Sequence, residues 1–276
     1  MLEVRRLSVE EFSAQVAPFL AAREVEHNLI LGILAQHVAR KTPQSDAVWL
    51  ALEDDVVLVA AAVRTPPQYV IVTELPAGGA RAVAEWFIAL GAVPDGASGP
   101  GDDGRDVLVA LREQLGGRVE LLSAETIYEL TRVATLAPPP GVARAAGESD
   151  RALLTGYFDA FIREVALPRG PDADELAARH VAAGTALLWD DGGPRAMACR
   201  ARKTPTGSAI GPVYTVPEAR GQGYGGAVTA ALSRRELDAG DRFVCLFADQ
   251  KNPTANRVYQ RLGFRPVRDF SVWTLC

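Results

Sequence analysis

The sequence is poor in the residue types that build disulfide frameworks, zinc sites and membrane spans. It contains three cysteines, widely spaced and odd in number, and three histidines without ligand spacing. Neither a disulfide framework nor a metal site is therefore expected. The apolar run at residues 56–63 is far short of the roughly 20 residues that a membrane-spanning helix needs. No membrane partner is expected either.

Positive charge is also in short supply. Lys and Arg total 29 against 34 Asp and Glu, the net charge is −5, and no basic cluster is present. This balance argues against a protein that binds nucleic acid through its phosphate backbone. Residues 1–6 carry charges where a signal peptide would have its apolar run, so a cytoplasmic protein is expected.

Glycine, in contrast, is concentrated in one place. Residues 209–216 read as an apolar strand, and four glycines follow within residues 221–226, directly before a helix-forming run. Glycine lets backbone N–H groups turn toward one point without interference from Cβ atoms. The unpaired N–H groups and the dipole of the helix start favour negative charge. The pattern predicts a phosphate or pyrophosphate site, with a plain strand-to-helix turn as the alternative.

One interpretation of this loop is a dinucleotide site. Gly221, Gly223 and Gly226 have the spacing of the dinucleotide fingerprint, and Asp241 follows about twenty residues later. That fold expects several parallel strands after the motif, and only about 50 residues follow here. Asp241 also precedes the next strand, at residues 242–248, instead of ending it. The dinucleotide interpretation is disfavoured.

A second interpretation accounts for two motifs together. Arg220-x-x-Gly223-x-Gly225 resembles the acyl-CoA loop of the GNAT superfamily of acyl-CoA N-acyltransferases. The later run Asn252-x-x-Ala255-x-x-x-Tyr259-x-x-x-Gly263-Phe264 resembles the motif that follows this loop in the superfamily. The resemblance implies an α+β fold, with a mixed, mostly antiparallel twisted sheet flanked by helices. It also implies acetyl-CoA as co-substrate.

The resemblance further implies where the donor binds. The strand at residues 208–216 should carry a bulge and separate from the next strand, so that pantetheine pairs with its backbone while loop amides hold the pyrophosphate. The implied cofactor-binding residues are Val213, Tyr214, Thr215, Arg220, Gly221, Gln222, Gly223, Tyr224, Gly225, Asn252, Asn256 and Tyr259.

Catalytic roles follow from the same resemblance. The N–H of Thr215 would stabilise the oxyanion, and Tyr259 would protonate the leaving thiolate. Asn252 would bind the pantetheine or sulfur end, although it could also cap a helix. The general base is left open between Glu164, Asp249 and a chain of water molecules.

Proline marks a division of the chain. Three consecutive prolines make residues 137–141 an extended linker. Residues 142–276 would form the catalytic GNAT domain. Residues 1–136 have the element order of a GNAT fold, with last strands expected at 118–122 and 126–133. No matching loop follows their strand at residues 70–73, where only Gly78 and Gly79 stand. This half is interpreted as a degenerate copy, with an unrelated α+β domain as the alternative.

The resemblance implies an N-acetyltransferase that moves an acetyl group to a primary amine of a small molecule or peptide, by direct attack in a ternary complex. A CoA-responsive binding or regulatory module without catalysis is the alternative. Tyr259 favours the enzyme, because a pure sensor need not retain the acid. No residue identifies the acceptor or the oligomeric state.

Overall fold

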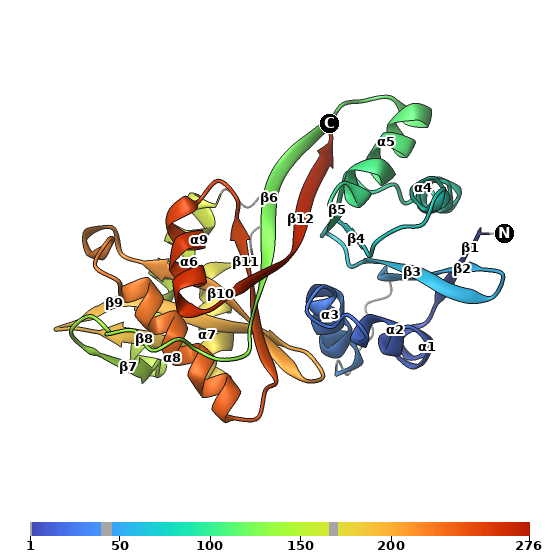
Figure 1. The fold of residues 1–276 in the computed structure, drawn as a ribbon. Coiled ribbons are helices and arrows are strands. Elements are labelled where there is room, and N and C mark those ends of the chain that lie inside the picture. The colour runs from blue at the N-terminus through green and yellow to red at the C-terminus, as the bar shows by residue number, and fades with distance from the viewer. Residues whose placement is uncertain (1, 40–45, 166–170) are drawn as a thin grey trace. The chain divides into compact units, whose positions relative to one another are not determined.

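The computed structural model describes residues 2–39, 46–165 and 171–276, and these form two compact units of mixed helix and strand (Figure 1). Unit 1 contains Met1–Ile127, Ala248–Asn252 and Pro266–Cys276, and unit 2 contains Tyr128–Phe247 and Pro253–Arg265. Each unit is α+β, as predicted.

Unit 1 is built on a sheet with the strand order β1-β2-β3-β4-β5-β12-β6. Its pairs β1–β2, β2–β3, β3–β4 and β5–β12 are antiparallel, and β4–β5 is parallel. Helices α4 and α5 bury Phe87, Leu108 and Leu111 against inward-facing residues of β2 and β3. Its elements are β1 (Leu2–Leu7), α1 (Val9–Gln15), α2 (Ala17–Ala21), α3 (Asn28–Val38), β2 (Val48–Asp54), β3 (Val57–Arg64), β4 (Val70–Val72), α4 (Gly79–Leu90), β5 (Gly96–Pro100), α5 (Asp103–Leu115), most of β6 (Val119–Leu130) and β12 (Arg265–Leu275).

Unit 2 has the order β11-β10-β9-β8-β7, and only the pair β10–β11 is parallel. Helix α6 packs on β8, β9 and β10 through the fully buried Leu154 and Phe158, and α7 joins the same core through Leu176 and Ala177. Its elements are β7 (Val142–Ala145), the 3-10 turn η1 (Glu148–Asp150), α6 (Arg151–Glu164), α7 (Ala173–Ala182), β8 (Ala186–Asp190), β9 (Pro194–Lys203), β10 (Gly207–Thr215), the 3-10 turn η2 (Pro217–Ala219), α8 (Tyr224–Asp238), β11 (Phe243–Asp249) and α9 (Pro253–Leu262).

The compact units differ from the contiguous halves expected at residues 1–136 and 142–276. β12, near the end of the chain, pairs with β5 of unit 1 from Phe270↔Pro100 to Thr274↔Gly96. Residues 128–141, expected in the first half and the linker, belong to unit 2. The two strands expected at 118–122 and 126–133 are one strand, β6. Strand β5, Gly-Ala-Ser-Gly-Pro, was not predicted because it lacks the apolar alternation of a strand.

One end of β10 is fixed by a buried network of charges. Ser208 Oγ donates to Asp241 (2.5 Å), and Glu236 accepts hydrogen bonds from Arg200 and Arg235. Burial would raise the pKa of the Glu236 carboxyl, but the Arg235 hydrogen bond and the nearby cations outweigh it and lower the pKa. Because these groups lie on β9, β10 and α8, the network holds together the elements that carry the candidate site.

Within the described ranges, every helix is too short or too polar to cross a membrane.

Candidate active site

Strands β10 and β11 run side by side for only part of their length. Their parallel ladder extends from Gly207↔Phe243 to Ile210↔Leu246. Past Ile210, β10 stays paired with β9 as far as Thr215↔Ala196, and its register shifts on both sides of Ile210. The predicted bulge is therefore present. We call the place where the two strands stop pairing the β10–β11 split.

The backbone groups of two residues of β10 face this split. The Val216 N–H donates to the carbonyl of Arg195 on β9 (3.1 Å). Because neighbouring residues of a strand direct their backbone groups to opposite edges, the groups of Val213 and Thr215 point away from β9. Those of Tyr214 point toward β9. Of the three residues predicted to pair with pantetheine, Val213 and Thr215 are thus oriented for it and Tyr214 is not.

The glycine loop leads from β10 into α8. Gly221 and Gly223 adopt positive φ, 76° and 91°, and Gly223 is the N-cap residue of α8. The first helical hydrogen bond runs from Ala227 N–H to the Gly223 carbonyl. The N–H groups of Tyr224, Gly225 and Gly226 therefore have no acceptor within the helix. Together with the helix dipole they form a place for an anion.

Two glycines of the loop allow α8 to begin in close contact with its neighbours. A Cβ atom on Gly225 would lie 2.8 Å from Thr215 Oγ1, and one on Gly226 would lie 3.0 Å from Val258 Cγ1 of α9. Any larger residue would displace α8 from β10 or from α9. The start of α8 thus packs directly against the end of β10 and against α9, which carries Tyr259, because Gly225 and Gly226 have no side chains.

Arg220 links the loop to α6. Its Nη2 lies 2.5 Å from Glu164 Oε1, its Nε donates to the Thr215 carbonyl (3.0 Å), and its Cζ lies 5.7 Å from the centre of the Tyr214 ring. The hydrogen bond with Glu164 raises the pKa of the guanidinium further. Glu164, a candidate base from the sequence, is therefore held in an ion pair at the mouth of the loop.

Three other side chains that were predicted to bind acetyl-CoA form hydrogen bonds within the protein. Gln222 Nε2 donates to the Glu218 carbonyl (3.0 Å), and the buried Tyr224 donates to Asp191 (2.6 Å). Asn256 accepts from the hydroxyl of Tyr128 on β6 (2.9 Å). Gln222 thus shapes the loop through a local bond, whereas Tyr224 ties the start of α8 to Asp191, 33 residues earlier in the chain.

The position of Tyr128 could not be predicted, because it lies more than a hundred residues before Asn256 in the sequence. It is buried and fixes the first turns of α9.

Tyr259 is half-buried on α9, and its ring packs edge-on against Phe264 at 5.8 Å. Burial raises the pKa of its hydroxyl to about 12. Within the described residues, no protein group forms a hydrogen bond to this hydroxyl. The group is therefore protonated at neutral pH and has a proton to give, as the general-acid prediction requires.

Asn252 and Asp249 lie in the segment that groups with unit 1. Asn252 N–H donates to the Asp249 carbonyl (3.0 Å), and the Asp249 side chain accepts from the Lys251 N–H (2.8 Å). These bonds shape the turn before α9. The roles of Asn252 in pantetheine binding and of Asp249 as base stay predictions.

Unit 1 repeats the strand arrangement of unit 2. Its parallel pair β4–β5 has only the pairs Val70↔Ala97 and Ile71↔Ser98, after which Thr73 follows β3 and Pro100 follows β12. The next helix, α4, is preceded by its N-cap residue Gly78, which has a φ of 81°. This glycine corresponds to Gly223.

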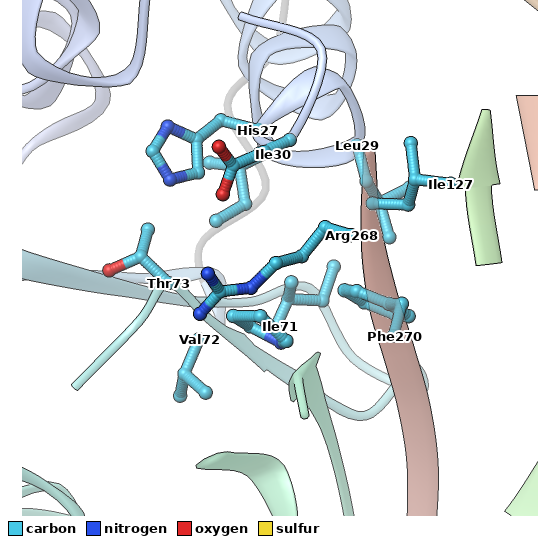
Figure 2. A pocket seen from close by; sticks show the side chains of 11 residues that line it. His27, Leu29, Ile30, Ile71, Val72, Thr73, Ile127, Arg268 and Phe270 are labelled. Carbon is cyan, nitrogen blue, oxygen red and sulfur yellow. The ribbon is translucent and has the colours of Figure 1, made fainter. Parts of the chain in front are cut away.

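The place corresponding to the β10–β11 split is filled in unit 1. Side chains of β4, α3 and β12 surround it, and Arg268 reaches across it toward Thr73 (Figure 2). Arg268 donates to Glu74 (3.0 Å), which also accepts from Arg23 (2.8 Å). The remaining space is about 10 Å³, roughly one water molecule. This packing supports the interpretation of the first copy as degenerate.

The described part of the chain holds no group of three or more His, Cys, Asp or Glu side chains placed to bind a metal ion.

Part of the chain is similar in sequence to known proteins. Residues 191–274 match the family described as FR47-like protein. A mycothiol acetyltransferase of Paenarthrobacter aurescens is 46% identical over 59 residues, which are 20% of this chain and 18% of that protein. The chain thus matches less than a fifth of this relative's length.

Solved structures resemble the whole chain. A GCN5-related N-acetyltransferase from Sphaerobacter thermophilus has a TM-score of 0.65 at 17% identity, covering 99% of this chain and 94% of that one. A tandem GNAT protein from the clavulanic acid biosynthesis pathway has a TM-score of 0.58 at 15% identity, covering 99% and 98%. Residues 191–274 thus resemble the FR47-like family, and the whole chain has the fold of these GNAT acetyltransferases.

Proposed function

We propose that unit 2 transfers an acetyl group from acetyl-CoA to a primary amine of a small molecule or peptide. The observation that carries the proposal is the β10–β11 split, which leads directly into a glycine-capped helix start. An extended pantetheine arm pairs with the outward backbone groups of Val213 and Thr215, and the diphosphate accepts from the first N–H groups of α8.

The chemistry assigned to each group follows from its position. The amine nitrogen attacks the thioester carbon, and the carbon–sulfur bond breaks. The Thr215 N–H stabilises negative charge on the carbonyl oxygen. Tyr259 gives its proton to the leaving thiolate. The amine loses its proton to a chain of water molecules or to one of the candidate bases, Glu164 and Asp249. The name of the Paenarthrobacter relative supports acetyl as the transferred group.

The Paenarthrobacter relative does not identify the acceptor, because the match covers 18% of its length. A primary amine is proposed from the resemblance of the loop and the Asn252–Tyr259 motif to N-acyltransferases. The test is release of free CoA from acetyl-CoA in the presence of a panel of amines, with Tyr259→Phe as the inactive reference. CoA binding without turnover of any amine would favour the binding-module alternative.

The donor site itself is tested by calorimetric titration with acetyl-CoA. Gly223→Trp should abolish binding, because the side chain is strained at positive φ and covers the helix start. Gly78→Trp is the matched control, since Gly78 has the same backbone conformation in unit 1 and open space around it. Binding of one acetyl-CoA per chain, lost only in Gly223→Trp, is the expected result. Equal loss of acetyl-CoA binding in both variants contradicts the proposal. So does a wild-type protein that binds NADH but not acetyl-CoA.

A further inference from the structure

We propose that Glu164 is a positioning residue that competes with the diphosphate of the donor for the Arg220 guanidinium, so that donor binding and release of Glu164 are coupled. This inference rests on the proposed function. It concerns regulation of the same site and not the chemistry of acyl transfer.

The two residues join elements with different roles. Glu164 is the last residue of α6, and Arg220 stands between η2 and the first left-handed glycine of the loop. The pair connects residues 56 positions apart in the sequence. A change at the loop is therefore transmitted directly to the end of α6.

Arg220 also occupies part of the β10 edge. Its Nε donates to the Thr215 carbonyl, one of the backbone groups that face the β10–β11 split. A pantetheine amide that pairs with this carbonyl needs the same acceptor. Movement of Arg220 toward the diphosphate would leave both the Thr215 carbonyl and the Glu164 carboxylate without this partner.

The balance of charge favours such an exchange. Both side chains are about half exposed, 47% for Arg220 and 46% for Glu164, and exposed ion pairs are weak. A diphosphate carries more negative charge than one carboxylate and binds where the helix dipole also attracts it. The guanidinium fork can bind phosphate oxygens bidentately.

A double-mutant cycle tests the competition. Dissociation constants for CoA are measured by calorimetry on wild type, Glu164→Gln, Arg220→Ala and the double variant. Glu164→Gln should bind CoA about 1.5- to 5-fold more tightly, the range that an exposed ion pair supports. In the Arg220→Ala background, the same substitution should have no effect. Glu164→Gln should leave the affinity for pantetheine unchanged, because pantetheine lacks the diphosphate.

Glu218→Gln is the matched control, because Glu218 is an exposed carboxylate of the same loop that has no ion pair with Arg220. A gain in Glu218→Gln equal to that in Glu164→Gln would show simple charge repulsion and overturn the inference. A gain that persists without Arg220 would do the same. Steady-state kinetics give the second readout: Glu164→Gln should lower KM for acetyl-CoA. A hundredfold loss of kcat with unchanged CoA affinity would instead identify Glu164 as the base.

The two proposals fail differently. Wild type that does not bind CoA rejects the donor site, and the competition falls with it. Wild type that binds CoA, with no coupling between positions 164 and 220, rejects the competition alone. Melting temperatures of all variants confirm that each one folds.

Discussion

Thr215 Oγ1 lies 2.8 Å from the point that a Cβ atom on Gly225 would occupy. The residue proposed to stabilise the oxyanion therefore touches the backbone proposed to bind the diphosphate. The two sites cannot move independently, because the Thr215 side chain packs directly against the backbone of Gly225. This contact gives the first prediction.

Gly225→Ala should reduce acetyl transfer at least tenfold. The added methyl group overlaps Thr215, and such overpacking costs about 1–3 kcal/mol. The overlap is relieved by a shift of β10 or of α8. Either shift misplaces the Thr215 N–H or the helix start. Steady-state kinetics and a calorimetric titration with CoA measure the effect.

Gly156→Ala is the control for this substitution. Gly156 lies within α6, and a Cβ there meets open space. Replacing a helical glycine by alanine should raise the free energy of unfolding by about 0.5–1 kcal/mol and leave CoA affinity unchanged. Loss of CoA affinity in both variants would show that the Thr215 contact is not the cause.

Tyr259→Phe should lower kcat by about 10²- to 10⁴-fold, the range of a general acid. Because the pKa of Tyr259 is raised to about 12 by burial, the hydroxyl stays protonated throughout the assay range. The variant should therefore lower the rate without removing a pH limb between pH 6 and 10. Unchanged kcat would exclude Tyr259 as the acid.

Tyr157→Phe is the matched control. Its hydroxyl donates to the Pro194 carbonyl (2.7 Å), and burial raises its pKa to about 12 as well. Removing it should cost about 1 kcal/mol of stability with kcat within a few-fold of wild type.

His180 should make the protein less stable in mild acid. It is buried against Phe158 and bonded to Thr185 (2.7 Å), and burial lowers its pKa to about 4. Between pH 6.5 and 4 this histidine is protonated in the unfolded chain and neutral in the folded protein. The free energy of unfolding therefore falls as pH falls through this window. His180 should account for about 2 kcal/mol of the free energy of unfolding that is lost between pH 7 and pH 5.

Urea unfolding of wild type and His180→Gln at both pH values checks this share. The variant is less stable at pH 7 but should lose less between pH 7 and 5. Parallel pH dependence of the two proteins would mean that other groups cause the acid sensitivity.

Val56→Gly should stabilise unit 1. Asp55 and Val56 form the two-residue turn between β2 and β3 with φ of 46° and 65°, and the Val56 side chain is 92% exposed. A β-branched residue is strained in this conformation, whereas Asp-Gly is favoured in such a turn. Relief of the strain should raise the free energy of unfolding by about 1 kcal/mol. Val56→Ala keeps a Cβ atom and should raise the free energy of unfolding less. An equal rise in both variants would show that removing the exposed valine side chain, and not relieving backbone strain, is the cause.

The part of the fold from β10 to α9 was predictable because its causes are local. An apolar run predicts the strand, glycines at positive φ predict the turn into α8, and the positions of Asn252 and Tyr259 follow from the next helix. The same local causes operate at Gly78 in unit 1. There the glycine and the strand before it were visible in the sequence, but its parallel partner β5 was not.

The glycine loop, the helix start after it and the Tyr259 motif follow from the sequence alone, since steric freedom and hydrogen bonding act between near neighbours. Tertiary structure alone decided that β12 joins unit 1, that Tyr128 holds Asn256 and that Glu164 holds Arg220. These pairs are separated by 56 to more than a hundred residues. Such partners are chosen by which surfaces become buried together, and that depends on the whole fold.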